Sequence, residues 1–135
     1  MAYCSAQCNQ VVRVLVVDDE EDVQWLFRQF FRSEVRSGQV EFQFSQSAEE
    51  ALAYLESGGR AEIVLVLSDI NMPGMTGLEL LRRIKELYSG LPVHMITAYG
   101  DDGNYRTAMD YGADGYLMKP LDFDQLKKII AGTGS

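Results

Sequence analysis

Cysteine, histidine, tryptophan and proline are scarce in this chain, which has two Cys, one His, one Trp and three Pro among its 135 residues. Both cysteines, Cys4 and Cys8, lie close to the N-terminus with no histidine nearby, so they cannot complete a zinc site. We interpret them as free thiols, a use of cysteine that is typical of a reducing compartment. Neither a disulfide framework nor a zinc module is expected.

Long apolar runs and positive charge are also in short supply. No apolar stretch approaches the length of about 18 residues that a membrane-spanning helix needs. The N-terminus lacks the basic and apolar regions of a signal peptide. With 12 Lys and Arg against 20 Asp and Glu, the net charge is −8, which disfavours direct contact with nucleic acid or anionic lipid. Length and composition instead fit one folded domain.

What the chain does contain is a regular alternation of apolar runs and amphipathic segments. The runs that we interpret as strands are Val11–Val17, Val40–Phe44, Ile63–Leu67, Val93–Thr97 and Tyr116–Met118. The first and third are apolar almost throughout, as parallel strands buried on both faces usually are. The second alternates between apolar and polar residues, which predicts an edge strand.

Helix-starting signals fall between these strands. Ser47-Ala-Glu-Glu50 and Thr76-Gly-Leu-Glu79 are capping boxes, and Asp122 is placed to cap a last helix. A first helix is expected after Glu20, and a fourth over residues 103–111. Each connection between consecutive strands therefore contains a helix.

Strict alternation of strand and helix predicts a flavodoxin-like three-layer α/β/α sandwich. Its five parallel strands would follow the order 2-1-3-4-5, with helices on both faces. We expect this domain over residues 11–131, between an N-terminal tail of 1–10 and a C-terminal tail or linker of 132–135. The binding crevice of such a sheet lies at the carboxyl ends of its first and third strands.

Polar side chains gather at the carboxyl ends of the predicted strands. They are Asp18, Asp19 and Glu20 after the first strand, Asp69 after the third, Thr97 at the end of the fourth and Lys119 after the fifth. Crowded carboxylates repel one another, and a magnesium ion bound through oxygen ligands would neutralise them. Taken singly, the acidic pair reads as a helix N-terminal cluster and Lys-Pro as a turn. Together, a carboxylate nucleophile, a metal, a cation and a hydroxyl are what phosphorylation of an aspartate requires.

Four segments carry a family resemblance: V-L-V-V-D-D-E at 14–20, S-D-I-N-M-P-G-M-T-G at 68–77, I-T-A at 96–98 and G-A-D-G-Y-L-M-K-P at 112–120. In them the chain resembles the receiver domain of two-component response regulators. The resemblance implies a cytoplasmic phosphoprotein of a phosphorelay, which takes its phosphoryl group from a sensor histidine kinase or phosphotransfer protein. It also implies signal output to an effector protein or a fused output domain.

The resemblance assigns the phosphorylation and metal-binding roles residue by residue. Asp69 is the phosphoacceptor, whose phosphorylation depends on Mg²⁺ or Mn²⁺. Asp19 and Asp69 bind the metal directly, Asp18 binds it through water, and Asn71 offers its backbone carbonyl. The Lys119–Pro120 peptide is expected to be cis.

The same resemblance assigns a switch. Thr97 and Lys119 hold phosphoryl oxygens, and Tyr116 swings inward when Thr97 moves. This changes the surface formed by the fourth helix, fifth strand and fifth helix, through which the family also forms homodimers. Asn71 and Tyr99 border the path of the attacking water and are expected to tune dephosphorylation.

The rival class is an enzyme, a phosphohydrolase that forms the same aspartyl phosphate on a small substrate. Such enzymes usually carry a second Asp two residues after the nucleophile, where this chain has Asn71, and a cap domain for the substrate, which this chain lacks. We therefore expect catalysis only of the chain's own phosphorylation and dephosphorylation. A third class, a metal-binding module that is never phosphorylated, is opposed by the presence of Asp69 and Lys119.

Three features are left without a functional role. Trp25 in the first helix is interpreted as a core residue, and His94 as a packed or edge residue of the fourth strand. The connection that includes Arg32–Gly38 is slightly long, and the sequence offers no function for it.

Overall fold

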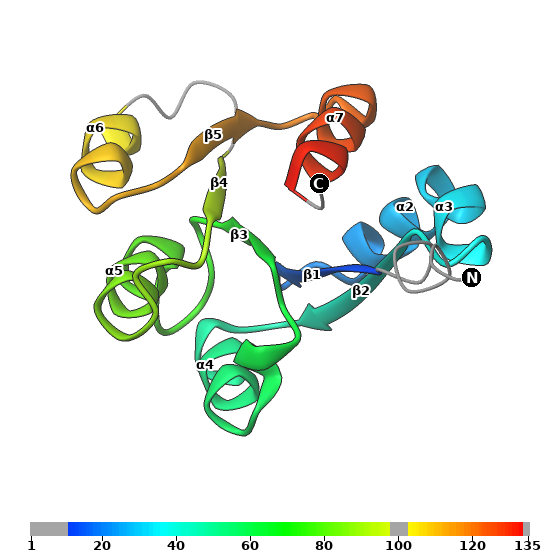
Figure 1. The fold of residues 1–135 in the computed structure, drawn as a ribbon. Coiled ribbons are helices and arrows are strands. Elements are labelled where there is room, and N and C mark those ends of the chain that lie inside the picture. The colour runs from blue at the N-terminus through cyan, green and yellow to red at the C-terminus, as the bar shows by residue number, and fades with distance from the viewer. Residues whose placement is uncertain (1–10, 98–102, 134–135) are drawn as a thin grey trace.

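The computed structural model describes residues 11–97 and 103–133, which form one parallel sheet between two layers of helices (Figure 1). The strands are β1 (Val12–Val17), β2 (Val40–Ser45), β3 (Leu65–Asp69), β4 (Val93–Thr97) and β5 (Gly115–Met118). Their order, β2-β1-β3-β4-β5, confirms the predicted topology, and β2 is an edge strand as expected.

In the described part of the chain, six helices and one short 3-10 turn connect or follow the strands. They are α2 (Glu21–Phe30), α3 (Arg32–Arg36), α4 (Ala48–Glu56), η1 (Gly59–Ala61), α5 (Gly77–Leu87), α6 (Gly103–Asp110) and α7 (Phe123–Thr133). Helices α2, α3 and α7 cover one face of the sheet, and α4, α5 and α6 cover the other (Figure 1). Within residues 11–97 and 103–133, no helix has both the length and the apolar character needed to cross a membrane.

The apolar character of β1 reflects its position between two separate cores. Val14 and Val16 belong to the core under α2 and α7, whereas Leu15 and Val17 belong to the core under α4 and α5. All four are at most 1% exposed. A strand that packs helices on both faces has no polar side, which is why its sequence does not alternate.

The predicted helix caps form hydrogen bonds in the structure. Ser47 Oγ accepts from the backbone N–H of Glu50 at 3.0 Å, and Thr76 Oγ1 accepts from that of Glu79 at 3.3 Å. Asp122 Oδ1 accepts from two backbone N–H groups in the first turn of α7. Each cap satisfies donors that the helix itself leaves unpaired.

Some predicted boundaries were wrong. The third strand begins at Leu65, because the N–H of Ile63 bonds to the carbonyl of Gly59 and so belongs to the preceding turn. This strand also extends to Asp69. At the other end of the chain, α7 continues to Thr133, into residues assigned to a tail. The long connection after α2 contains the separate helix α3.

The interpretation of Trp25 as a core residue was also wrong. Its side chain is 61% exposed. Val23 and Phe27, one helical turn apart, are the residues of α2 that are buried. A residue midway between them in sequence lies on the opposite side of the helix and faces away from the sheet.

The start of α5 packs against the end of β3 so closely that a side chain at Gly77 would collide with the backbone of Asp69 and Ile70. For Gly77→Ala we expect the free energy of unfolding to fall by more than about 2 kcal/mol, because backbone cannot move aside cheaply. Gly90→Ala is the matched control, since nothing lies within 4 Å of a Cβ there. Urea denaturation measures the free energy of unfolding of both variants. Equal values for Gly77→Ala and Gly90→Ala would contradict this packing.

Candidate functional site

Four carboxylates from two neighbouring strands converge at the carboxyl edge of the sheet. Asp18, Asp19 and Glu20 follow β1, and Asp69 is the last residue of β3, which pairs with β1 in parallel. One carboxylate oxygen from each of the four lies within 4.8 Å of the others. Asp18 and Asp69 are only 6% and 5% exposed, whereas Asp19 and Glu20 are exposed. The site therefore has a buried floor and an open mouth.

Lys119, which follows β5, brings a positive charge to this cluster. Its Nζ lies 3.3 Å from Asp18 Oδ2 and 3.4 Å from Asp69 Oδ2. Glu20 Oε1 lies 3.5 Å from the same atom. The Lys119–Pro120 peptide is cis, as expected. A single ammonium thus serves three carboxylates, and the cluster keeps an excess of negative charge.

Burial and like charge set the ionisation of the two inner carboxylates. Burial raises the pKa of Asp18, and both burial and the charge of Asp18 raise the pKa of Asp69. Burial alone would lower the pKa of Lys119, but the charges of Asp18 and Asp69 outweigh it and raise that pKa. The lysine is therefore protonated at neutral pH. Keeping the two carboxylates ionised costs free energy of folding.

These donors fit a hard divalent cation. Carboxylate oxygens without nitrogen or sulfur ligands suit Mg²⁺ or Mn²⁺ better than zinc or copper. Asp18 Oδ1 accepts a hydrogen bond from the backbone N–H of Glu20 at 2.9 Å. The other oxygen, Oδ2, faces Lys119 in the cluster. Asn71 lies in the loop after β3, and its backbone N–H bonds to the Asp69 carboxylate.

The hydroxyl of Thr97 is a polar group suited to a ligand. Thr97 ends β4, next to β3, and its side chain is fully buried. Among the residues that the structure describes, nothing hydrogen-bonds to its Oγ1. A buried hydroxyl without a partner is costly, so it gains stability from an incoming acceptor such as a phosphoryl oxygen.

Tyr116 lies in β5 on the sheet face covered by α6. Its ring makes an edge contact with Tyr105 of α6, with centroids 5.1 Å apart and planes at 89°. Tyr99, the other aromatic residue assigned a role, lies outside the described residues.

Sequence reasoning placed Glu20 among the polar residues at the strand ends, without a metal-binding role, but missed another carboxylate that takes part in this region. Glu49 Oε2 accepts the backbone N–H of Met75 at 3.2 Å and so holds the loop after β3 against α4. No local pattern predicts a contact between residues so far apart in sequence.

The chain is similar in sequence to known proteins. The family model described as the response regulator receiver domain matches residues 14–131. Response regulator protein FleR of Pseudomonas aeruginosa is 39% identical over 119 residues, which are 88% of this chain and 24% of FleR. A 14.6 kDa protein of Leptolyngbya boryana is 36% identical over 119 residues and is covered over 86% of its length. The chain spans about a quarter of FleR and of the similar NtrC proteins.

Solved structures show the same fold. A receiver domain protein from Clostridium thermocellum superimposes with a TM-score of 0.79 at 28% identity, covering 90% of this chain and 93% of that one. The receiver domain of NtrX from Brucella abortus superimposes with a TM-score of 0.76 at 31% identity. The match covers 89% of this chain and 96% of that one.

The crowding of buried carboxylates predicts that Asp69→Asn stabilises the metal-free protein. One buried charge disappears, so we expect the free energy of unfolding to rise by about 1 kcal/mol at neutral pH. Because the pKa of Asp69 is raised in the folded state, the folded protein binds this proton more tightly than the unfolded chain does. The gain in stability of Asp69→Asn over the wild type is therefore complete at a pH above the folded-state pKa of Asp69. It shrinks as the pH falls through that pKa.

Chemical denaturation with a chelator present, repeated across pH, measures this effect. Lys119→Met is the opposed control, which should lower stability because it leaves the same carboxylates without their cation. Stability of Asp69→Asn equal to that of the wild type at every pH would contradict the electrostatic account.

Proposed function

The chain belongs to the response regulator receiver domain family, and we propose that residues 11–131 accept a phosphoryl group on Asp69 from a sensor histidine kinase or phosphotransfer protein, with Mg²⁺ or Mn²⁺ as cofactor. The observation that carries this proposal is the position of Lys119 Nζ, 3.3 Å from Asp18 and 3.4 Å from Asp69. A buried carboxylate beside a lysine ammonium and further carboxylates that can bind a metal is equipped for phosphoryl transfer.

In the proposed reaction one carboxylate oxygen of Asp69 attacks the phosphorus of a phosphorylated histidine. A bond forms from that oxygen to phosphorus while the bond from phosphorus to the imidazole nitrogen breaks, and the nitrogen takes the bonding electron pair. Negative charge is spread over the phosphoryl oxygens during transfer. Lys119 Nζ pairs with one of these oxygens, and the hydroxyl of Thr97 donates to another.

The divalent cation would be held by Asp19 and Asp69 directly, by Asp18 through water, and by the backbone carbonyl of Asn71. When bound, it offsets the charge of the crowded carboxylates and of the phosphoryl oxygens. The exposure of Asp19 supports this assignment, since the ion can enter from solvent while keeping part of its water shell.

A cleft beside the site supports a protein rather than a small molecule as the physiological donor. It measures about 480 Å³ and is lined by Glu20, Asp22, Val23, Leu26, Phe30, Lys119, Pro120, Leu121 and Phe123. Most of this lining is apolar, and Phe30 is 50% exposed at its edge. An apolar cleft that shares Glu20 and Lys119 with the acidic site suits a partner that buries surface while it presents its phosphohistidine.

For the output, we propose that Thr97 moves onto the phosphoryl group and Tyr116 follows it inward. This changes the surface of α6, β5 and α7, where Tyr105 is 51% and Met118 47% exposed. An effector protein, an output domain or a second copy of the chain would read this surface. The length of relatives such as NtrC, a DNA-binding transcriptional regulator, supports an output domain.

We do not propose a turnover enzyme. Asn71 stands where an aspartyl-phosphate phosphohydrolase usually carries its acid, so the chain would catalyse only its own phosphorylation and dephosphorylation. Asn71 and Tyr99 remain the residues predicted to tune the lifetime of the phosphorylated state, and the cytoplasm remains its predicted location.

Incubation with a small phosphodonor and Mg²⁺ should add one phosphate to the wild-type protein. Asp69→Asn should add none, because an amide cannot act as the nucleophile. Asp110→Asn, which changes an exposed aspartate on α6, is the control and should be labelled like the wild type. Intact-mass measurement reads the result, and a phosphate that persists on Asp69→Asn would refute the assignment.

The metal assignment predicts that Asp19 matters more than Glu20. We expect Asp19→Asn to weaken Mg²⁺ binding at least about tenfold, as loss of a direct ligand does, and Glu20→Gln to weaken it less. Calorimetric titration measures both variants in the unphosphorylated protein. Equal losses of affinity in the two variants would show that Asp19 has no special role.

A further inference from the structure

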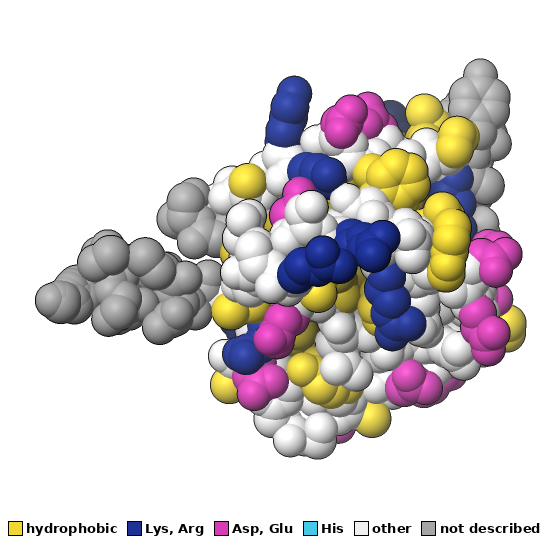
Figure 2. Space-filling model, turned by 90° about the vertical axis from the view of Figure 1, so that its right-hand side faces the viewer, with side chains coloured by type: hydrophobic (Ala, Val, Ile, Leu, Met, Phe, Trp, Pro, Cys, Tyr) yellow, Lys and Arg dark blue, Asp and Glu magenta, His cyan; other side chains and the backbone are white. Residues whose placement is uncertain are grey.

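The outer side of α2 and α3 carries a concentration of positive charge on a chain whose net charge is −8. Arg28, Arg32 and Arg36 follow one another at intervals of four residues, and all three are exposed. Trp25, one turn before Arg28, is 61% exposed. Figure 2 looks onto this side of the molecule and shows Lys and Arg side chains gathered across its middle. We call Trp25, Arg28, Arg32 and Arg36 the basic band.

The basic band spans the boundary between α2 and α3, which lies at Phe31. The N–H of Phe31 bonds to the carbonyl of Phe27 at 3.0 Å, and that of Val35 bonds to the carbonyl of Phe31 at 2.9 Å. Phe31 therefore ends α2 and begins α3. Trp25 and Arg28 are neighbours on the surface of α2, and Arg32 and Arg36 are neighbours on that of α3.

The charge of the band is not neutralised from within the domain. On α5, by contrast, Arg82 and Arg83 pair with Glu79 at 2.6 and 3.0 Å. Among residues 11–97 and 103–133, no ion pair includes an arginine of the basic band. The difference indicates that these arginines are placed for a partner outside the domain.

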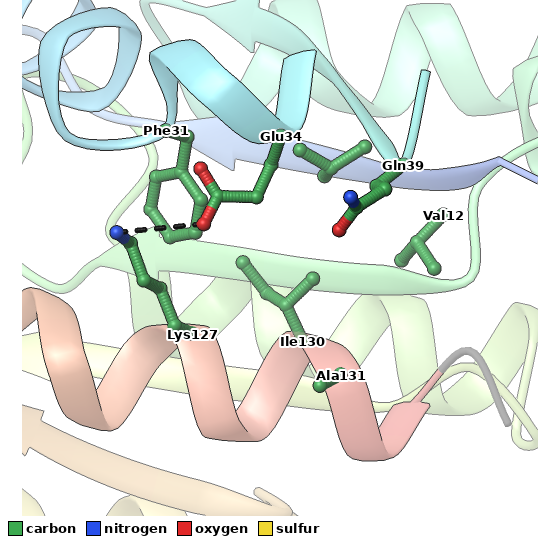
Figure 3. Close-up of a pocket in the computed structure, with 8 residues that line it drawn as sticks. Val12, Phe31, Glu34, Gln39, Lys127, Ile130 and Ala131 are labelled. Carbon is green, nitrogen blue, oxygen red and sulfur yellow. Dashed lines mark ion pairs between the residues drawn. The ribbon is translucent and has the colours of Figure 1, made fainter. Parts of the chain in front are cut away.

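The acidic residue of α3 is engaged elsewhere. Glu34 Oε2 lies 3.4 Å from Lys127 Nζ of α7, across a pocket of about 390 Å³ with a largely apolar lining (Figure 3). Lys127 also lies over the ring of Phe31, 5.7 Å from its centroid. This pair links α3 to α7, so Glu34 is paired with Lys127 and not with an arginine of the basic band.

The arginine at the start of the band is held in place by the sheet. The guanidinium of Arg28 lies over the ring of Phe44 in β2, 5.3 Å from its centroid. A stacked arginine loses less conformational freedom when it binds and still presents its N–H donors to solvent. Arginine and tryptophan are also the residues that contribute most often to binding energy at protein interfaces.

We propose that the basic band is a docking surface for an acidic segment of a partner protein. Each arginine offers a planar set of donors that matches a carboxylate, and Trp25 offers an apolar surface beside them. The net charge of −8 disfavours a nucleic acid, since a long phosphate backbone would also meet the acidic remainder of the surface. A short acidic segment covers less of that acidic surface. This surface does not depend on phosphorylation of Asp69.

Trp25 is the only tryptophan of the chain, so its fluorescence reports binding directly. The probe is a short oligoglutamate peptide, titrated at low salt into the wild-type protein and into Arg32→Gln/Arg36→Gln. We expect saturable binding to the wild type that weakens with added salt. In the variant the affinity should fall by about tenfold, as loss of two exposed ion pairs allows at low salt.

Arg83→Gln/Arg106→Gln is the matched control, because it removes the same charge from α5 and α6 on the other face of the sheet. It should bind the peptide like the wild type, and all three proteins should accept phosphate from a small donor equally. Absence of peptide binding, or equal loss in both variants, would overturn the proposal. Tighter binding of a single-stranded oligonucleotide of equal charge, lost in the same variant, would assign the band to nucleic acid instead.

Discussion

The ammonium of Lys119, between the buried carboxylates of Asp18 and Asp69, is the interaction on which the site depends. Without it, two negative charges would face each other with little solvent, and burial already raises the pKa of both. One cation is nevertheless too few, because Asp19 and Glu20 extend the cluster toward solvent. The excess of carboxylates favours a divalent cation, and in the proposed function Lys119 then pairs with a phosphoryl oxygen. In the proposed function, metal binding relieves part of the electrostatic cost that the folded state carries.

The parallel sheet is what brings these groups together and what connects them to the surface. Strands β1, β3, β4 and β5 all end at the same edge, where Asp18, Asp69, Thr97 and Lys119 lie at or just after the strand ends. The N–H of Lys119 bonds to the carbonyl of Thr97 at 2.8 Å, which joins β4 to β5 beside the site. Tyr116 lies three residues before Lys119, against α6. A change at Asp69 thus has a short path to α6 and β5, whereas the basic band on α2 and α3 lies on the opposite face.

Much of this arrangement could be predicted from sequence because the signals were local. Apolar runs, capping residues and the acidic and basic residues at strand ends were enough for the topology and for Asp18, Asp69, Thr97 and Lys119. The errors have two sources. Trp25 was misplaced because tryptophan is usually well buried, whereas its helical position opposite Val23 and Phe27 puts it on the outside. The contact of Glu49 with Met75 and that of Glu34 with Lys127 join distant segments, and no local pattern predicts either.

The central claim is that Asp69, and no other residue, carries the phosphoryl group. Its most direct test treats the phosphorylated protein with borohydride, which reduces an acyl phosphate to an alcohol, and then maps the reduced residue by peptide mass spectrometry. The account predicts a homoserine at position 69, formed only when donor and Mg²⁺ were both present. Reduction at Asp18 or Asp19 instead, or phosphate retained on His94, would contradict it.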